Sequence, residues 1–212
     1  MDDLDRIADP GYIPSDDDVL RARLKTVGVT EYRFTRETSN VIGSDWRIYD
    51  VGGSRTQRPA WAPYFQDVHA IIFLAPISCF DQVLVEDATV NRLEDTVILW
   101  KSLCGNQLLK KCNLILFMNK TDLMAKKLEA GVRLARYIPS YGTRANDFTT
   151  ASTCRLTPSR EMLLLTLGNV TDLKKKFQLI FNDNSPQRRP FYCHMTSLTV
   201  SSLPPPPGNT SR

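Results

Sequence analysis

The sequence predicts an α/β fold, in which helices cover the faces of a mostly parallel sheet. Two short apolar runs, His69–Ala75 and Asn113–Met118, are bounded by polar segments, as is typical of strands buried on both faces of a parallel sheet. A segment of helical periodicity separates the runs, and strands that alternate with helices are the pattern of α/β proteins. The 212 residues are enough for one domain of about 150 residues and an attachment.

The N-terminal third predicts a β-hairpin. Residues 1–20 are acidic and contain two prolines, so we expect the end of a short helix followed by a loop. Polar and apolar residues alternate over Glu31–Arg36 and Asp45–Asp50, which predicts two half-buried strands, and turn residues between them indicate an antiparallel pair. Trp46 in the second strand and Trp100 further along are predicted to belong to the core.

The helix expected between the two apolar runs is amphipathic. Its apolar residues recur at helical spacing and form one stripe, Leu93, Val97, Trp100 and Cys104. The charged residues Glu94, Asp95 and Lys101 are expected to point away from that stripe. A second helix is predicted after Ser159, whose hydroxyl is a suitable cap, and Phe191–Thr196 is predicted as the last strand.

The composition is that of an ordinary globular chain. Hydrophobic residues make up 42% and charged residues 24%, which excludes a wholly disordered chain, a coiled coil and a collagen-like repeat. The formal net charge is +4, but the basic residues are scattered, so no nucleic-acid partner is predicted. The 5 cysteines include no C-x-x-C pair and are interpreted as reduced, structural thiols.

No export signal or membrane span is expected. The acidic start MDDLDRIADP is not a signal peptide, and the most apolar stretch, Ala70–Ile77, is far shorter than the ~20 residues that a membrane span requires. We therefore expect a cytoplasmic protein without a transmembrane segment. Residues 201–212 contain four consecutive prolines and are expected to form a disordered tail, with a proline-type docking motif as the alternative.

The first motif that carries chemistry is Asp50-Val51-Gly52-Gly53, directly after a predicted strand. In open α/β sheets, ligands bind beyond the carboxyl ends of the strands. An aspartate there can hold a magnesium-bound water, and a glycine lets backbone N–H groups approach a phosphate. Taken alone, the motif is better interpreted as a simple turn.

The second motif, Asn119-Lys120-Thr121-Asp122, follows the second apolar run. A carboxylate can accept the N1 and N2 hydrogens of guanine, which adenine does not offer as a pair. The lysine stem can cover the base while the asparagine ties neighbouring loops together. The alternative is a surface turn with a solvated charge pair.

The third motif, Arg21-Ala22-Arg23-Leu24-Lys25-Thr26, precedes the hairpin. A guanidinium has the donor geometry to stabilise charge on a transferring phosphoryl group, and a threonine hydroxyl can join a magnesium shell. Taken alone, this segment is better interpreted as a solvated basic loop.

In their order and spacing, the three motifs resemble the α subunit of heterotrimeric G proteins. The segment LDRIADPGYIPSDDDVLRARLKTVGVTEYRF is similar to the end of that family's helical domain and its first switch, and WRIYDVGGSRTQRPAWAPYFQDVHAIIFLAPIS to its second switch and the next strand. LVEDATVNRLEDTVILWKSLC is similar to the following helix, and LILFMNKTDL to the guanine-specificity loop. The resemblance implies a P-loop-GTPase-like G domain, with residues 1–20 a remnant of the helical domain and linker, 21–200 a partial Ras-like GTPase domain and 201–212 the tail.

The resemblance also implies roles for individual residues. Arg23 becomes the catalytic arginine supplied in cis, and Ser54 stands at the catalytic position where the family has a glutamine that orients the attacking water. Thr26 and Asp50 are the implied magnesium ligands. The implied nucleotide contacts are Leu20, Arg21, Ala22, Arg23, Asp50, Val51, Gly52, Gly53, Ser54, Asn119, Lys120, Thr121, Asp122, Thr196 and Leu198. The residues implied to contact the βγ partner are Arg55, Arg58 and Trp61.

Two departures from the family concern the proposed reaction. No G-x-x-x-x-G-K-[ST] phosphate loop occurs in the 212 residues, so we expect a chain truncated at its N-terminus that lacks this loop and the first strand of the sheet. Ser54 also lacks the paired donor and acceptor of a glutamine amide, so we expect slow hydrolysis.

The resemblance implies a GTP/GDP switch with GTPase activity and Mg2+ as its cofactor. The implied partners are a G-protein βγ dimer, a G protein-coupled receptor and an effector, which would bring the protein to the inner face of the plasma membrane. The alternative is a non-catalytic pseudo-GTPase fragment, which is either an interaction module or a chain that does not fold alone.

Overall fold

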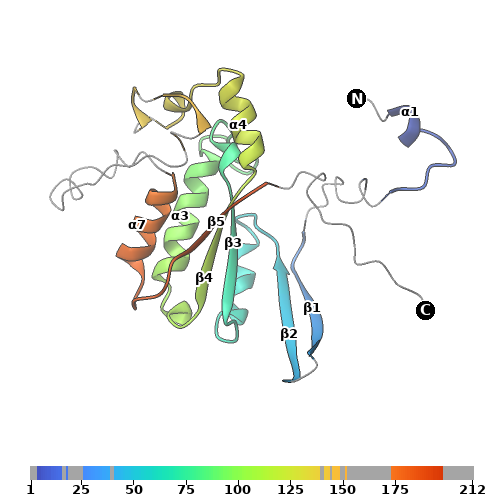
Figure 1. Ribbon diagram of the computed structural model, residues 1–212, viewed down its shortest axis with the longest axis vertical. Helices are drawn as coiled ribbons and strands as arrows, with labels where there is room; N and C mark the ends of the chain where they lie inside the picture. Colours follow the sequence, from blue (N-terminus) through green and yellow to red (C-terminus); the bar gives the residue numbers. More distant parts are fainter. Residues whose placement is uncertain are drawn as a thin grey trace. The chain divides into compact units, whose positions relative to one another are not determined.

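The computed structural model (Figure 1) describes residues 4–15, 18, 26–38, 41–138, 141–143, 145–148, 151 and 173–197, with the backbone alone for residues 36–38 and 41–44. The chain divides into two compact units, Met1–Pro63 and Tyr64–Arg212. The division predicted near residues 20 and 200 stays a prediction. Each unit is described by itself.

The first unit contains the predicted hairpin. A short helix, α1 (Leu4–Ile7), comes before two antiparallel strands, β1 (Val29–Thr38) and β2 (Val41–Val51). Both strands are longer than predicted because their backbone pairing continues beyond the alternating residues at both ends. A 3-10 helix, η1 (Arg58–Tyr64), follows β2.

One face of the hairpin is apolar and exposed. Tyr32 pairs with Ile48 and Phe34 with Trp46, so the four side chains share this face. The prediction that Trp46 belongs to the core is wrong, because its side chain is 56% exposed. A two-stranded sheet cannot enclose a tryptophan between its own strands.

The second unit contains a parallel sheet in the order β3 (Ala70–Pro76), β4 (Asn113–Asn119) and β5 (Tyr192–Thr196). Each strand begins and ends within one residue of the predicted one, because a polar residue or a proline lies at each end of these runs. The helices are α3 (Arg92–Gly105), α4 (Thr121–Glu129) and α7 (Leu173–Asn184), with the 3-10 helices η2 (Ile77–Cys79), η3 (Gln107–Leu109) and η4 (Leu134–Arg136). The α/β fold class is therefore confirmed. The helix start predicted at Ser159 lies outside the described residues.

Trp100 of α3 lies at the centre of the core. Its ring centroid is 5.2 Å from that of Phe73 on β3 and 6.2 Å from those of Phe177 and Phe181 on α7. The indole N–H donates to the carbonyl of Phe177 at 3.0 Å, so the buried polar atom is satisfied. In Figure 1, α3 and α7 lie side by side along the sheet.

The predicted stripe of α3 is confirmed, but one residue beside it is not where the pattern placed it. Leu93, Trp100 and Cys104 are buried, and Val97 is half-buried. Asp95, which the pattern directs away from the core, is only 4% exposed. Asp95 lies in the first turn of α3, where the partial positive charge of the helix N-terminus favours a carboxylate.

The sheet is covered on one face only within the described part of its unit. Ile72 and Leu74 of β3 alternate with buried residues and are 59% and 57% exposed, so the prediction of a strand buried on both faces is wrong for β3. Right-handed crossovers between strands added in one direction place their helices on the same face, and α3 and α7 belong to two such crossovers.

The cysteines of the described residues are free thiols, as predicted. Cys79, Cys104 and Cys112 are buried and Cys193 is half-buried, whereas Cys154 lies outside the described residues. Burial raises the pKa of Cys104 to about 12, so this thiol stays protonated and unreactive at neutral pH.

Candidate functional site

The second motif forms a joint between the ends of two neighbouring strands. The carboxamide oxygen of Asn119, at the end of β4, accepts the backbone N–H of Lys120 at 2.7 Å and the hydroxyl of Thr196 at 3.3 Å. The Thr121 hydroxyl donates to the carbonyl of Thr196, the last residue of β5, at 3.2 Å. Residues more than 70 positions apart in the chain are thereby held together at the carboxyl end of the sheet, where ligands of α/β proteins bind.

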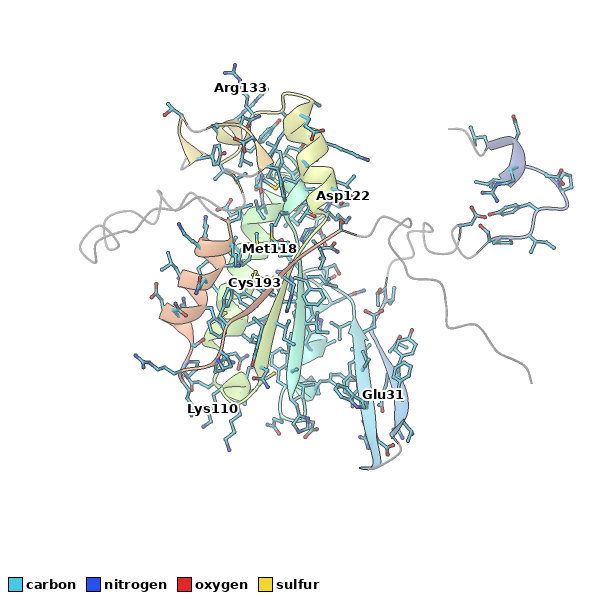
Figure 2. All side chains as sticks on the ribbon, viewed as in Figure 1. Glu31, Lys110, Met118, Asp122, Arg133 and Cys193 are labelled. Atoms are coloured by element: carbon cyan, nitrogen blue, oxygen red, sulfur yellow. The ribbon has the colours of Figure 1, made fainter. Side chains whose placement is uncertain are left out.

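The backbone at this joint turns sharply into α4. Lys120 has φ 61° and ψ 40°, and no other non-glycine residue in the described part of the chain has a positive φ. Such a conformation is unfavourable for a lysine and is a frequent feature of functional turns. It places Asp122 in the first turn of α4, at the opposite end of the sheet from Lys110 (Figure 2).

Asp122 is available as an acceptor. Its carboxylate is half-buried and has no hydrogen bond or ion pair with another residue of the described chain. A carboxylate in this setting can accept two N–H groups of one ligand. The arrangement fits the N1 and N2 hydrogens of guanine, which are the donors that the motif predicts for this carboxylate.

The first motif and Thr26 meet in the other unit. β1 and β2 pair up to Val29 and Val51, and beyond this pair the N–H of Gly52 donates to the carbonyl of Gly28 at 3.0 Å. A Cβ on Gly52 would lie 2.8 Å from the carbonyl oxygen of Thr26, which is closer than side chains approach. Glycine at residue 52 therefore lets the two segments approach each other.

The two glycine carbonyls are held by side chains from η1. The indole N–H of Trp61 donates to the Gly52 carbonyl at 3.0 Å, and Nε of Arg58 donates to the Gly53 carbonyl at 3.3 Å. The N–H of Gly53 points the opposite way from the Gly52 carbonyl, because both belong to one planar trans peptide. This N–H has no partner among the described residues, and the space around Gly53 is open. The Gly53 N–H is therefore available to donate to an anion.

Ser54 lies directly after this donor. Its hydroxyl is 3.3 Å from that of Thr56, and its carbonyl accepts the N–H groups of Gln57 and Arg58 at 2.9 and 3.3 Å. These bonds form the turn into η1, so the backbone of Ser54 is fixed while its short side chain stays in the turn. The positions of Leu20, Arg21, Ala22, Arg23 and Leu198 lie outside the described residues.

The donor set of Thr26 and Asp50 fits magnesium. Both stand at the same end of the hairpin, and they offer one hydroxyl and one carboxylate. Mg2+ is commonly held by one or two such oxygens together with water and phosphate. Within the part of the chain that the structure describes, no group of three or more His, Cys, Asp or Glu side chains could hold a metal by itself.

A polar cluster near the N-terminus was missed by sequence reasoning. The guanidinium of Arg6 donates to both carboxylate oxygens of Asp18 at 2.8 and 2.7 Å, and Ser15 donates to one of them through its N–H and its hydroxyl. Arg6 first and Ser15 second hold the pKa of Asp18 well below its usual range. The Ser15-x-x-Asp18 spacing is a capping pattern and would have been the signal.

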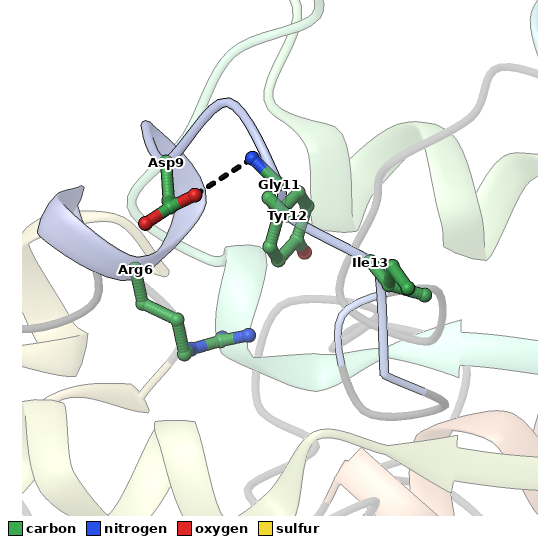
Figure 3. A pocket seen from close by; sticks show the side chains of 5 residues that line it. All are labelled: Arg6, Asp9, Gly11, Tyr12 and Ile13. Atoms are coloured by element: carbon green, nitrogen blue, oxygen red, sulfur yellow. Dashed lines mark hydrogen bonds between the residues drawn. The ribbon is translucent and has the colours of Figure 1, made fainter.

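The shallow pocket beside this cluster is lined by Arg6, Asp9, Gly11, Tyr12 and Ile13 (Figure 3). The N–H of Gly11 donates to the carboxylate of Asp9 at 2.7 Å, and the Arg6 guanidinium lies 5.5 Å from the centre of the Tyr12 ring. The charged groups are thus used within the segment, and we assign the pocket no ligand.

Comparison with known proteins identifies the family. The G-protein alpha subunit family matches residues 1–203. The chain belongs to that family. The chain is 51% identical over 148 residues to the guanine nucleotide-binding protein alpha-4 subunit of Mycosarcoma maydis; the match covers 70% of this chain and 25% of the relative.

Further relatives are also guanine nucleotide-binding protein alpha subunits. The guanine nucleotide-binding protein alpha-1 subunit of Schizosaccharomyces pombe is 35% identical over 205 residues, which is 96% of this chain and 47% of the relative. The guanine nucleotide-binding protein subunit alpha of Cochliobolus heterostrophus is 44% identical over 142 residues, 66% of this chain and 38% of the relative. The chain thus spans less than half the length of these relatives. None of its described helices is long and apolar enough to cross a membrane.

Proposed function

We propose that this chain binds guanine nucleotides as part of a G-protein alpha subunit and acts as a GTP/GDP switch with magnesium-dependent GTPase activity. The observation that carries the proposal is the joint at Asn119, which ties Lys120 to Thr196 and leaves the Asp122 carboxylate without a partner among the described residues. This combination provides a rigid frame and one open acceptor, which is what selective recognition of a base requires.

Each group has a role in the proposed reaction. Asp122 accepts from the guanine edge, and the Lys120 stem covers the base. The Gly53 N–H donates to the terminal phosphate, because Trp61 fixes the peptide that carries it. Thr26 and Asp50 hold Mg2+, which supplies positive charge to the phosphates when bound. Arg23, in our proposal, stabilises the charge that develops during phosphoryl transfer.

Ser54 makes the hydrolytic step slow in this proposal. A serine hydroxyl is too short and has too few hydrogen-bonding atoms to orient a water as a glutamine amide does. Ser54→Gln should therefore raise the single-turnover rate of GTP hydrolysis, by about tenfold or more. Thr56→Gln, two residues further on, is the matched control and should leave the rate unchanged. No increase with Ser54→Gln would contradict this role.

The proposed partners are a βγ dimer, a receptor and an effector, which would hold the protein at the inner face of the plasma membrane. Arg55, Arg58 and Trp61 are the proposed βγ contacts. Arg58 and Trp61 already donate to the carbonyls of Gly53 and Gly52. A partner that binds these two side chains would replace those hydrogen bonds and so release the peptide that orients the Gly53 N–H. Binding of the partner then lowers the affinity for phosphate, and binding of phosphate lowers the affinity for the partner.

A second candidate is a pseudo-GTPase that serves as an interaction module. It is favoured by Ser54, whose hydroxyl lacks the paired donor and acceptor of a glutamine amide. Equilibrium binding of labelled GTP and GDP, with Mg2+ and with ATP as competitor, separates the two. Guanine-specific binding supports the switch, whereas a folded chain that binds neither nucleotide supports the module and contradicts the switch.

A further inference from the structure

Gln57, a residue that the sequence does not single out, is packed against Gly52. A Cβ on Gly52 would lie 1.4 Å from Oε1 of Gln57, so the glutamine amide occupies the space that a side chain at residue 52 would need. The same point is 2.8 Å from the carbonyl oxygen of Thr26. The Gln57 amide, the Gly52 backbone and the Thr26 carbonyl therefore meet at one place.

The amide oxygen of Gln57, which lies at this place, accepts no hydrogen bond from the residues that the structure describes. Oε1 of Gln57 and Nε of Arg189 are the buried side-chain polar atoms without a hydrogen-bond partner in the described part of the chain. A buried carbonyl without a donor is unfavourable, and the nearby Thr26 carbonyl is a second acceptor. Rotation of the amide by 180° exchanges its oxygen and its NH2 without changing its shape. The NH2 then takes the place of the oxygen, in the region where the Thr26 carbonyl also lies.

We propose that the side-chain NH2 of Gln57 donates to the carbonyl of Thr26 and so positions Thr26 against the Gly52–Gly53 loop. This inference rests on the proposed function, in which the Thr26 hydroxyl binds magnesium and the Gly53 N–H contacts the terminal phosphate. Gln57 is then a positioning residue that couples the metal-binding segment to the phosphate-binding loop.

The backbone of Gln57 is suited to this role because it is fixed on both sides. Its N–H donates to the Ser54 carbonyl at 2.9 Å, and its carbonyl accepts the N–H of Ala60 at 3.0 Å. The side chain therefore enters the loop from a preorganised turn. The Gly52 N–H to Gly28 carbonyl bond joins the same two segments, so Gln57 supplements a backbone connection.

The contact itself can be tested by NMR on the whole chain labelled with 15N. The Gln57 side-chain NH2 signals are identified by their loss in Gln57→Met, which keeps the length of the side chain and removes its donor. The inference predicts that one of these protons exchanges with water about tenfold more slowly than those of Gln178, which is exposed on α7. Exchange as fast as that of Gln178 would overturn it.

The positioning role needs a measurement that general destabilisation does not move. In Gln57→Met, the Mg2+ concentration for half-maximal retention of GTP should rise about fivefold to tenfold, while GDP affinity without Mg2+ changes less than about twofold. Equal losses in both would overturn the positioning role. If the wild-type chain binds no guanine nucleotide, the proposed function fails, and the exchange measurement still decides whether the contact exists.

Discussion

The two units hold their candidate site residues by different means. In the unit Tyr64–Arg212, Asn119 and Thr196 end strands that are packed on a core centred on Trp100. In the unit Met1–Pro63, Gly52 and Gly53 follow a two-stranded hairpin and are fixed by single hydrogen bonds from Trp61 and Arg58. The residues proposed to bind the base thus depend on burial, whereas those proposed to bind phosphate depend on a few polar contacts.

The largest expected effect tests the role of burial. Trp100→Ala removes a fully buried ring and should lower the free energy of unfolding of its unit by about 3–5 kcal/mol. Trp46→Ala, in the hairpin, should cost less than about 1 kcal/mol because that ring is half exposed. Urea unfolding followed by circular dichroism measures both. Similar losses would contradict the contrast between the units.

Arg189 should have the next largest effect. Its guanidinium donates to the carbonyls of Cys104, Leu109 and Cys112 at 3.1, 2.7 and 2.9 Å, and so joins the end of α3 to η3 and to the start of β4. Arg189→Met removes the donor that these three carbonyls share, and within the described part of the chain only the Leu109 carbonyl keeps another, the N–H of Cys112 at 3.0 Å. The substitution should lower the free energy of unfolding by about 2–4 kcal/mol. Arg188→Met, at an exposed neighbour, should change it by less than about 0.5 kcal/mol. An unchanged free energy of unfolding in Arg189→Met would show that packing alone holds this end of the sheet.

The smallest effect sharpens the account of the hairpin unit. Gly52→Ala places a Cβ against Gln57 and Thr26 and should cost about 1–3 kcal/mol, whereas the Cβ of Gly53→Ala meets nothing within 4 Å. Gly53→Ala should therefore cost less than about 1 kcal/mol. Thermal unfolding followed by tryptophan fluorescence compares the two. Equal shifts of the melting temperature would contradict the close approach at Gly52.

The strands of the parallel sheet were predictable because their apolar residues are consecutive in the sequence. The runs around Phe73 and Leu116 are continuous and end at a polar residue or a proline, so the strand ends were placed within one residue. Trp46 was not predictable, because alternation shows which side chains share a face and not whether another layer covers it. The buried position of Asp95 likewise depends on the surroundings of the helix end, which no local pattern records.

The contacts of the candidate site were only partly predictable from the sequence. The motif at Asn119 and the resemblance predicted Asn119 and Thr196 at one site, and the structure joins their side chains at 3.3 Å; their role in binding a nucleotide stays a prediction. The bonds from Trp61 and Arg58 to the glycine carbonyls carry no sequence signal, since a donor that reaches a backbone carbonyl needs no particular pattern. Gln57 was missed for the same reason.

The central claim is that the frame around Asn119 and Asp122 reads guanine. Asp122→Asn offers an amide where guanine needs a second acceptor, and it complements xanthine, whose 2-oxo group accepts where guanine donates. Competition binding should show GTP affinity falling by at least about 100-fold and affinity for xanthosine triphosphate rising, while Asp183→Asn on the exposed face of α7 changes neither. Unchanged preference for GTP over xanthosine triphosphate in Asp122→Asn would contradict the account.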